Sequence, residues 1–117
     1  MIEFPIPTLA ESIVRDAALF LDRDGVINHD PGDYIRCPED WHLLEGTVEI
    51  MLAAQSRGYR LIIITNQGGI GLGLYTQEDL YRIHSKMQDT LASHGIRIDA
   101  VYACPHHPRS EPCLCRK

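Results

Sequence analysis

The chain has 117 residues, of which 44% are hydrophobic and 23% charged, and its formal net charge at pH 7 is −5. This length allows one domain at most, and the acidic balance argues against a nucleic-acid surface, which needs basic clusters. No apolar run reaches the roughly 18 residues that a membrane span requires, so we expect neither nucleic acid nor membrane as a partner. Residues 1–16 are expected to form a surface arm without a secretory signal, which favours the cytoplasm.

Three apolar runs of strand length are separated by two helical segments. The runs "AALFL" (17–21), "RLIIIT" (60–65) and "IDAVYA" (98–103) are typical of parallel strands buried on both faces. Residues 46–59 predict a helix that ends near Gly58. A second helix begins at the N-cap Thr76, ends at Gly95, and carries its apolar stripe on Leu80, Ile83, Met87 and Leu91. This alternation predicts an α/β fold with a parallel sheet and flanking helices.

Chemically active side chains follow all three predicted strands. Asp22 follows the first strand, Thr65 ends the second, and Cys104 follows the third. Parallel strands bring their carboxyl ends to one edge of the sheet, where ligands of open α/β sheets bind. We therefore expect these three positions to lie close together. Thr65 leads into a glycine-rich stretch, and its hydroxyl together with the backbone N–H groups of that stretch could cradle a phosphate. The alternative, which the glycines taken alone favour, is a flexible loop that leads into a helix.

The stretch "DRDGVIN" (22–28) places two acids one residue apart at a strand end. The Asp22 carboxylate could attack phosphorus to form an aspartyl-phosphate, while Asp24 could protonate the leaving oxygen and then activate water. Mg²⁺ suits such a pair because it prefers oxygen ligands and bridges carboxylate to phosphate. A strand that stops at a polar Asp-Gly turn is the alternative.

The tail "CPHHPRSEPCLCRK" (104–117) carries ligands that suit zinc. Cys104, His106, Cys113 and Cys115 could form a closed, structural Cys₃His site over the loop 104–115. His107 could replace His106 as the histidine ligand, and free thiols on a loop are the alternative. Four further polar or aromatic side chains favour structural roles: Cys37 is expected to be a lone thiol, His84 and His94 to be solvated on the second helix, and Trp41 to pack the loop 29–45 onto the core.

The motifs "FLDRDGVIN", "TNQGGIG" and "CPHH…CLCRK" resemble those of the haloacid dehalogenase-like phosphatases, from about residue 17 to the last residue. More narrowly they resemble the D-glycero-D-manno-heptose 1,7-bisphosphate phosphatases and the related histidinol-phosphate phosphatases. The resemblance implies a three-layer, Rossmann-like parallel sheet without a cap domain. It also implies an Mg²⁺-dependent phosphatase that acts on a small phosphorylated sugar, with heptose 1,7-bisphosphate as the first substrate and histidinol phosphate as the alternative.

The same resemblance assigns roles to individual residues. It implies that Asp22 is the nucleophile and Asp24 the general acid/base, with Mg²⁺ held by the Asp22 side chain and the Asp24 carbonyl. It implies that Thr65 and Lys117 steady the phosphoryl group. It implies structural zinc at Cys104, His106, Cys113 and Cys115. The residues expected to line the substrate pocket are Arg23, Asp30, Asp33, Tyr34, Asn66, Gln67, Gly68 and Arg116.

Two departures from the family pattern shape the expectation for this chain. Leu72 stands where family members often carry an arginine, and the sequence ends at Lys117, before the acidic motif that supplies a further Mg²⁺ ligand. Residues 1–117 are therefore expected to form one incomplete domain that is weakly active or inactive on its own, monomeric in full-length form and self-associating as the short chain. The competing function classes are a catalytically impaired, zinc-stabilised module and a phosphocarrier, which would hold its phosphoryl group for long periods.

Overall fold

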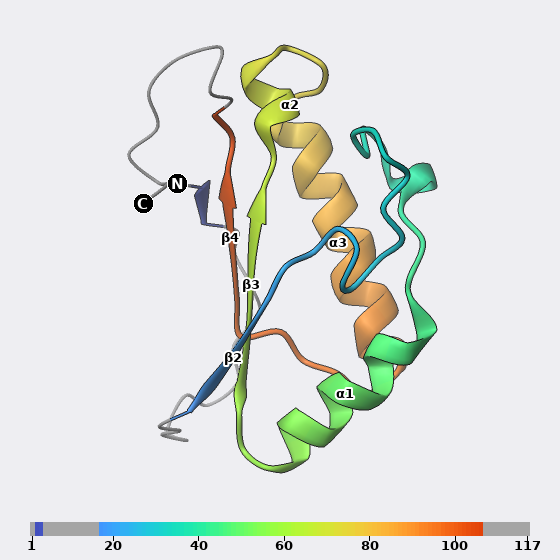
Figure 1. Cartoon of the computed structure of the whole chain (residues 1–117), viewed down its shortest axis with the longest axis vertical. Coiled ribbons are helices and arrows are strands. Elements are labelled where there is room, and N and C mark those ends of the chain that lie inside the picture. The colour runs from blue at the N-terminus through green and yellow to red at the C-terminus, as the bar shows by residue number, and fades with distance from the viewer. Residues whose placement is uncertain (1, 4–16, 107–117) are drawn as a thin grey trace.

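The computed structural model describes residues 2–3 and 17–106, which form a four-stranded sheet with helices beside it (Figure 1). The order of the strands across the sheet is β1-β4-β3-β2. In chain order the elements are β1 (Ile2–Glu3), β2 (Ala18–Leu21), the 3-10 helix η1 (Pro38–Asp40), α1 (Glu45–Ser56), β3 (Arg60–Asn66), α2 (Gly68–Gly71), α3 (Gln77–Ser93) and β4 (Ala100–Cys104).

The three predicted strands form the parallel part of the sheet. β2 pairs with β3 from Ala18 opposite Arg60, and β3 pairs with β4 up to Asn66 opposite Cys104. The prediction of a parallel sheet with two helical crossovers is therefore confirmed. The fourth strand, β1, was not predicted; it pairs antiparallel with β4 at the sheet edge, with Ile2 opposite Ala103. Two residues carry no periodicity, so only the partner strand reveals such an element.

The core lies between the sheet and the two long helices. Leu61 and Ile63 of β3 and Val101 of β4 are completely buried on the face that meets the helices. They pack in one cluster with Met51 of α1 and with the predicted apolar stripe of α3, which is wholly buried. Trp41 belongs to the same cluster, which confirms that it packs its loop onto the core.

The opposite face of the sheet has no helix among residues 2–3 and 17–106. Phe20 is 60% exposed and Ile64 is 40% exposed, and both point away from the helical side because strand side chains alternate. The expected three-layer arrangement is thus represented here by two layers, the sheet and its helices. No helix within the described ranges is long and apolar enough to cross a membrane.

The helix boundaries follow the predicted signals. α1 ends one residue before Arg57, and Gly58 has φ +88°, the left-handed conformation that glycine adopts without strain. Thr76 caps α3 in a reciprocal capping box with Asp79, in which each side chain accepts a hydrogen bond from the other's backbone N–H. The glycine-rich stretch is not a pure loop, since four of its residues form α2.

Candidate active site

The carboxyl ends of β2 and β3 lie side by side, which brings Asp22 and Thr65 to one edge of the sheet (Figure 1). Leu21 of β2 pairs with Ile63 of β3. Asp22 lies one residue after Leu21, and Thr65 lies two residues after Ile63. Thr65 in turn pairs with Ala103, and Cys104 follows at once in β4. The expected convergence of the three strand ends is therefore confirmed.

The Asp22 side chain is exposed, and no hydrogen bond or ion pair to another described residue engages it. The chain then turns sharply at Gly25, whose φ of +84° favours glycine. Within the described ranges no hydrogen bond uses the Asp24 backbone carbonyl either. An unengaged carboxylate and an unengaged carbonyl, two residues apart at a strand end, are hard oxygen donors that fit Mg²⁺.

The Asp24 carboxylate is held in one position, in contrast to Asp22. Its Oδ1 accepts hydrogen bonds from Arg23 Nε at 2.8 Å and Asn28 Nδ2 at 3.0 Å, and its Oδ2 accepts one from Gln67 Nε2 at 3.3 Å. Partial burial on its own would raise the pKa of Asp24. The hydrogen bond and charge of Arg23, with the donors Asn28 and Gln67, outweigh it and lower the pKa below its usual value.

Arg23 lies behind Asp24 and not at the surface. Its side chain is completely buried, and its Nη1 lies 3.2 Å from Nε2 of His84 on α3. Burial, followed by the positive charge of Arg23, lowers the pKa of His84 to about 3, so the imidazole stays neutral beside the guanidinium. The prediction that His84 is solvated was wrong, since only 1% of it is exposed; His94 is exposed as predicted.

Gln67 links the two strand ends chemically. Its amide nitrogen donates to Thr65 Oγ1 at 2.8 Å as well as to Asp24, and its amide oxygen accepts a hydrogen bond from the Tyr75 hydroxyl. Thr65, Gln67 and Tyr75 are all at least 95% buried. Burial is the main cause that raises the pKa of Tyr75 to about 12, so its hydroxyl keeps its proton at neutral pH.

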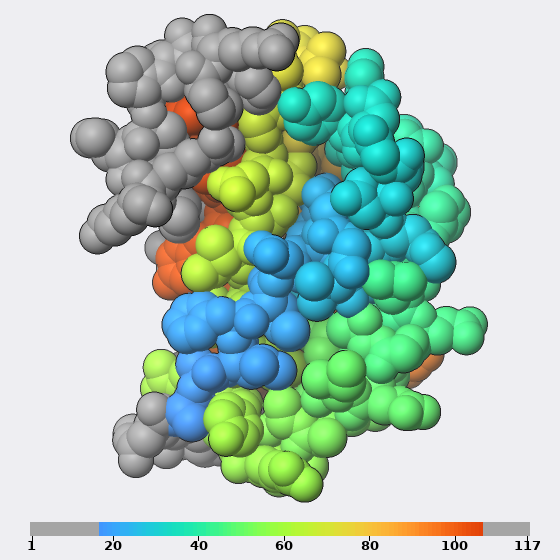
Figure 2. All heavy atoms as spheres, in the orientation of Figure 1, coloured from blue at the N-terminus to red at the C-terminus, as the bar shows by residue number. Residues whose placement is uncertain are grey.

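The loop that follows the acidic pair borders this network. Tyr34 is half-buried, and its ring lies 6.3 Å from that of Tyr75 at a tilt of 51°. Asp30 and Asp33 on the same loop are exposed, with Asp33 at 3.4 Å from Arg36. Figure 2 shows this loop (cyan) beside the segment around α2 at the upper end of the molecule.

The other residues expected to line the pocket differ in exposure. Asn66 at the end of β3 is exposed, whereas Gly68 at the start of α2 is buried. Gln67 between them turns both groups of its amide inward. Of the expected substrate residues on this edge, Asn66 and the loop acids are therefore open to solvent, whereas Gln67 and Arg23 are not.

The expected zinc site falls only partly within the described residues. Cys104 is buried and His106 half-buried at the end of β4, whereas Cys113 and Cys115 lie outside the described ranges, as do Arg116 and Lys117. Among residues 2–3 and 17–106 no group of three or more His, Cys, Asp or Glu side chains is placed to hold a metal ion.

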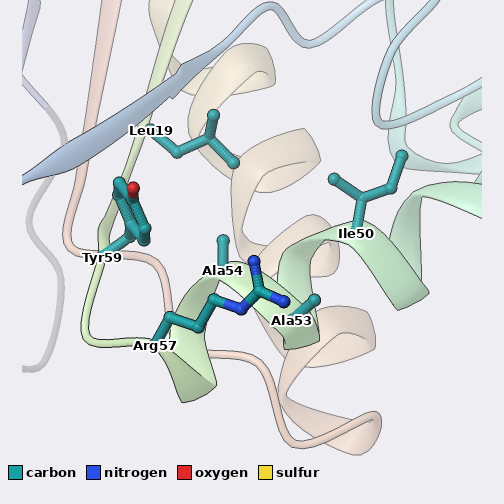
Figure 3. Close-up of a pocket in the computed structure, with 6 residues that line it drawn as sticks. All are labelled: Leu19, Ile50, Ala53, Ala54, Arg57 and Tyr59. Atoms are coloured by element: carbon teal, nitrogen blue, oxygen red, sulfur yellow. The ribbon is translucent and has the colours of Figure 1, made fainter.

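A shallow apolar hollow of about 380 Å³ lies at the other end of the sheet (Figure 3). It is lined by Leu19 of β2, by Ile50 and two alanines of α1, and by Arg57 and Tyr59. Tyr59 and Arg57 precede β3, so this hollow is at the opposite end of that strand from Thr65. It has no part in the chemistry of the strand-end carboxylates.

Two contributors to the site were not singled out from the sequence. His84 lies four residues after Leu80 and three before Met87, so the helical period itself places it on the buried face of α3. Tyr75 carries no such signal, because it follows a run of glycines outside any periodic segment. Only the three-dimensional structure reveals its contact with Gln67.

Comparisons with known proteins show which family the chain is similar to. The family model described as polynucleotide kinase 3 phosphatase matches residues 18–114. The D-glycero-alpha-D-manno-heptose-1,7-bisphosphate 7-phosphatase of Burkholderia mallei is 46% identical over 81% of this chain and 50% of its own length. The D-glycero-beta-D-manno-heptose-1,7-bisphosphate 7-phosphatase of Helicobacter pylori is 45% identical over 86% of this chain and 57% of its own length.

A solved structure supports the same grouping. The D,D-heptose 1,7-bisphosphate phosphatase from B. bronchiseptica, complexed with magnesium and phosphate, superposes with a TM-score of 0.80 and 35% identity, covering 87% of this chain and 56% of that one. The chain thus spans about half the length of the relatives that it matches. On the family match and these likenesses, the chain belongs to the polynucleotide kinase 3 phosphatase family, and its resemblance to the haloacid dehalogenase-like heptose bisphosphate phosphatases is confirmed.

Proposed function

We propose that the strand-end site belongs to a phosphatase that hydrolyses a small sugar phosphate, D-glycero-D-manno-heptose 1,7-bisphosphate first among candidates. The observation that carries this proposal is that the two neighbouring acids, Asp22 and Asp24, differ in exposure and in hydrogen bonding. Asp22 is exposed and makes no hydrogen bond or ion pair with the described residues, which leaves its oxygens available for attack, while Asp24 is held by three donors. The names of the relatives support the sugar bisphosphate as substrate.

The proposed reaction uses these two positions. An oxygen of Asp22 attacks phosphorus, forming an aspartyl-phosphate while the bond from phosphorus to the sugar oxygen breaks. Asp24, protonated for this step, gives its proton to the departing oxygen and then takes one from the water that attacks the aspartyl-phosphate. Inorganic phosphate leaves, and the Asp22 carboxylate is restored.

Arg23 acts on Asp24 in this proposal, and does not touch the substrate. Its buried guanidinium stabilises the charged form of the carboxylate that must accept a proton from water in the second step. The same interaction disfavours the protonated form needed in the first step. An arriving phosphate dianion offsets that effect, because a like charge nearby raises the pKa of a carboxyl group.

Two metal ions belong to the proposal. Mg²⁺, held by the Asp22 side chain and the Asp24 carbonyl, would neutralise charge that develops on the phosphoryl group. Zn²⁺, held by Cys104 and His106 with Cys113 and Cys115, would fix the loop that carries Arg116 and Lys117. Thr65 and Lys117 would steady the phosphoryl group, and Asp30, Asp33, Tyr34, Asn66 and Arg116 would bind the sugar.

The test compares phosphate release from heptose 1,7-bisphosphate and from histidinol phosphate, each with and without Mg²⁺. We expect release from the heptose bisphosphate that requires Mg²⁺ and is lost in Asp22→Asn. Preference for histidinol phosphate would correct the substrate and keep the mechanism. Zinc binding without any Mg²⁺-dependent release from either compound would favour a non-catalytic module. Release that survives in Asp22→Asn would overturn the assignment of the nucleophile.

A further inference from the structure

We propose that Tyr75 is a positioning residue, whose hydroxyl fixes the Gln67 amide so that it ties the Thr65 hydroxyl to the Asp24 carboxylate. This inference rests on the proposed function, because it concerns how the phosphate-holding strand end and the general acid/base keep their relative places. The aromatic side chain at position 75 does not itself touch the reacting atoms.

The orientation of the Gln67 amide follows from the chemistry of its neighbours. The charged Asp24 carboxylate can only accept hydrogen bonds, so the amide nitrogen must face it, and that nitrogen donates to Asp24 Oδ2 at 3.3 Å and to Thr65 Oγ1 at 2.8 Å. The amide oxygen then points the other way and needs a donor. Tyr75 supplies that donor from a buried position.

Without the Tyr75 hydroxyl, the amide oxygen of Gln67 would be a buried acceptor that has lost its partner, which is costly in a protein interior. The amide would turn to relieve this cost, and its nitrogen would leave Thr65 and Asp24. A Gln67 side chain that is 99% buried cannot compensate by reaching bulk water. The Tyr75 hydroxyl therefore controls the hydrogen bonds of the Gln67 amide nitrogen, although Tyr75 itself contacts only the amide oxygen.

The absence of a side chain at Gly69 leaves the space that the Tyr75 ring occupies. A Cβ atom on Gly69 would lie 2.3 Å from Tyr75 Cε1 and 3.0 Å from Tyr34 Cδ1. The ring thus occupies space that any other residue at position 69 would fill, and the Tyr34 ring lies beside the Tyr75 ring at a tilt of 51°. Ring packing restricts where the Tyr75 hydroxyl can point, so its hydrogen bond to Gln67 is set by the fold.

The experiment uses Tyr75→Phe, Gln67→Met and the double variant, with Tyr102→Phe as the control that removes a tyrosine hydroxyl from the far face of the sheet. The first readout is the nuclear magnetic resonance signal of the Gln67 side-chain amide, identified by its loss in Gln67→Met. We expect this signal to shift or broaden in Tyr75→Phe and to stay in place in Tyr102→Phe. An unchanged signal in Tyr75→Phe overturns the inference.

The second readout is the hydrolysis of heptose 1,7-bisphosphate. We expect kcat to fall about tenfold in Tyr75→Phe, the effect of one lost buried hydrogen bond, with little change in KM. If Tyr75 acts through Gln67, adding Tyr75→Phe to Gln67→Met lowers kcat no further. Additive losses, or an unchanged kcat, overturn the inference. A parent chain without any hydrolysis agrees with the expected inactivity of an incomplete domain, and the amide signal alone then decides on Tyr75.

Discussion

Replacing Gly69 with alanine tests how tightly the site is packed. The added Cβ would stand 2.3 Å from Tyr75 Cε1, whereas carbon atoms in contact prefer roughly 3.5–4.0 Å, so the ring must move by more than about 1 Å. The ring has little freedom to move, because Tyr75 is 5% exposed and its hydroxyl is hydrogen-bonded to Gln67.

The expected loss of stability can be estimated from three contributions. Overpacking costs about 1–3 kcal/mol, and breaking the hydrogen bond between Tyr75 and Gln67 costs about 1 kcal/mol more. The better helix propensity of alanine in α2 offsets up to about 1 kcal/mol of this loss of stability. We therefore expect Gly69→Ala to lower the free energy of unfolding by about 1–4 kcal/mol.

Gly46→Ala is the matched control, because Gly46 lies in α1 and a Cβ there would meet nothing within 4 Å. Helix propensity predicts that this variant is as stable as the parent or up to about 1 kcal/mol more stable. Urea denaturation measures both, with the slope m checked for constancy. If Gly69→Ala proved as stable as Gly46→Ala, the close packing of Tyr75 against Gly69 would be refuted.

Three further substitutions probe the electrostatics and the capping of the fold. Asp24→Asn removes the charge partner of the buried Arg23 and should lower the free energy of unfolding by about 2–3 kcal/mol, less than the ~3–5 kcal/mol of a fully buried pair because Asp24 is partly exposed. Asp22→Asn should change it by less than about 0.5 kcal/mol. Equal effects of the two variants in denaturant titrations would contradict the different environments of the two acids. His84 binds its proton only near pH 3 in the folded chain, against the usual 6.5, so the unfolded chain holds the extra proton between these values and stability should fall as the pH is lowered through that window. His84→Leu should flatten that part of the profile, and a profile unchanged by His84→Leu would speak against a buried neutral imidazole. Thr76→Ala should cost about 1 kcal/mol through loss of the capping box, and thermal unfolding unaffected by it would show that α3 does not depend on this cap.

The sequence predicted those features that depend on local pattern. Apolar runs located β2, β3 and β4, and the signals at Gly58 and Thr76 located the helix ends, because each depends on a few adjacent residues. β1 was missed because a two-residue strand is defined by its partner. α2 was missed because glycines disfavour helix, and its backbone is held by contacts such as the hydrogen bond from the Gly71 amide to the Pro105 carbonyl.

The site was predictable at the level of its strand ends and less so in its interior. The acidic pair and Thr65 stand out because parallel strands bring their carboxyl ends together. The direction in which each side chain points was not predictable. Arg23 and Gln67 were expected in the substrate pocket, but both side chains turn inward. Arg23 contacts His84, 61 residues away in sequence, and Gln67 contacts Asp24, 43 residues away. Such long-range pairings are set by the packing of α3 and of the glycine-rich segment against the sheet.

The central claim, that Asp22 is the nucleophile of a phosphoryl transfer, is tested most directly by trapping the acyl phosphate. The protein is mixed with heptose 1,7-bisphosphate and Mg²⁺, reduced with borohydride, and sequenced by mass spectrometry. We predict conversion of Asp22 to homoserine, absent in Asp22→Asn and absent without substrate. Homoserine at another acidic position, or phosphate release without any reducible adduct, would contradict the account.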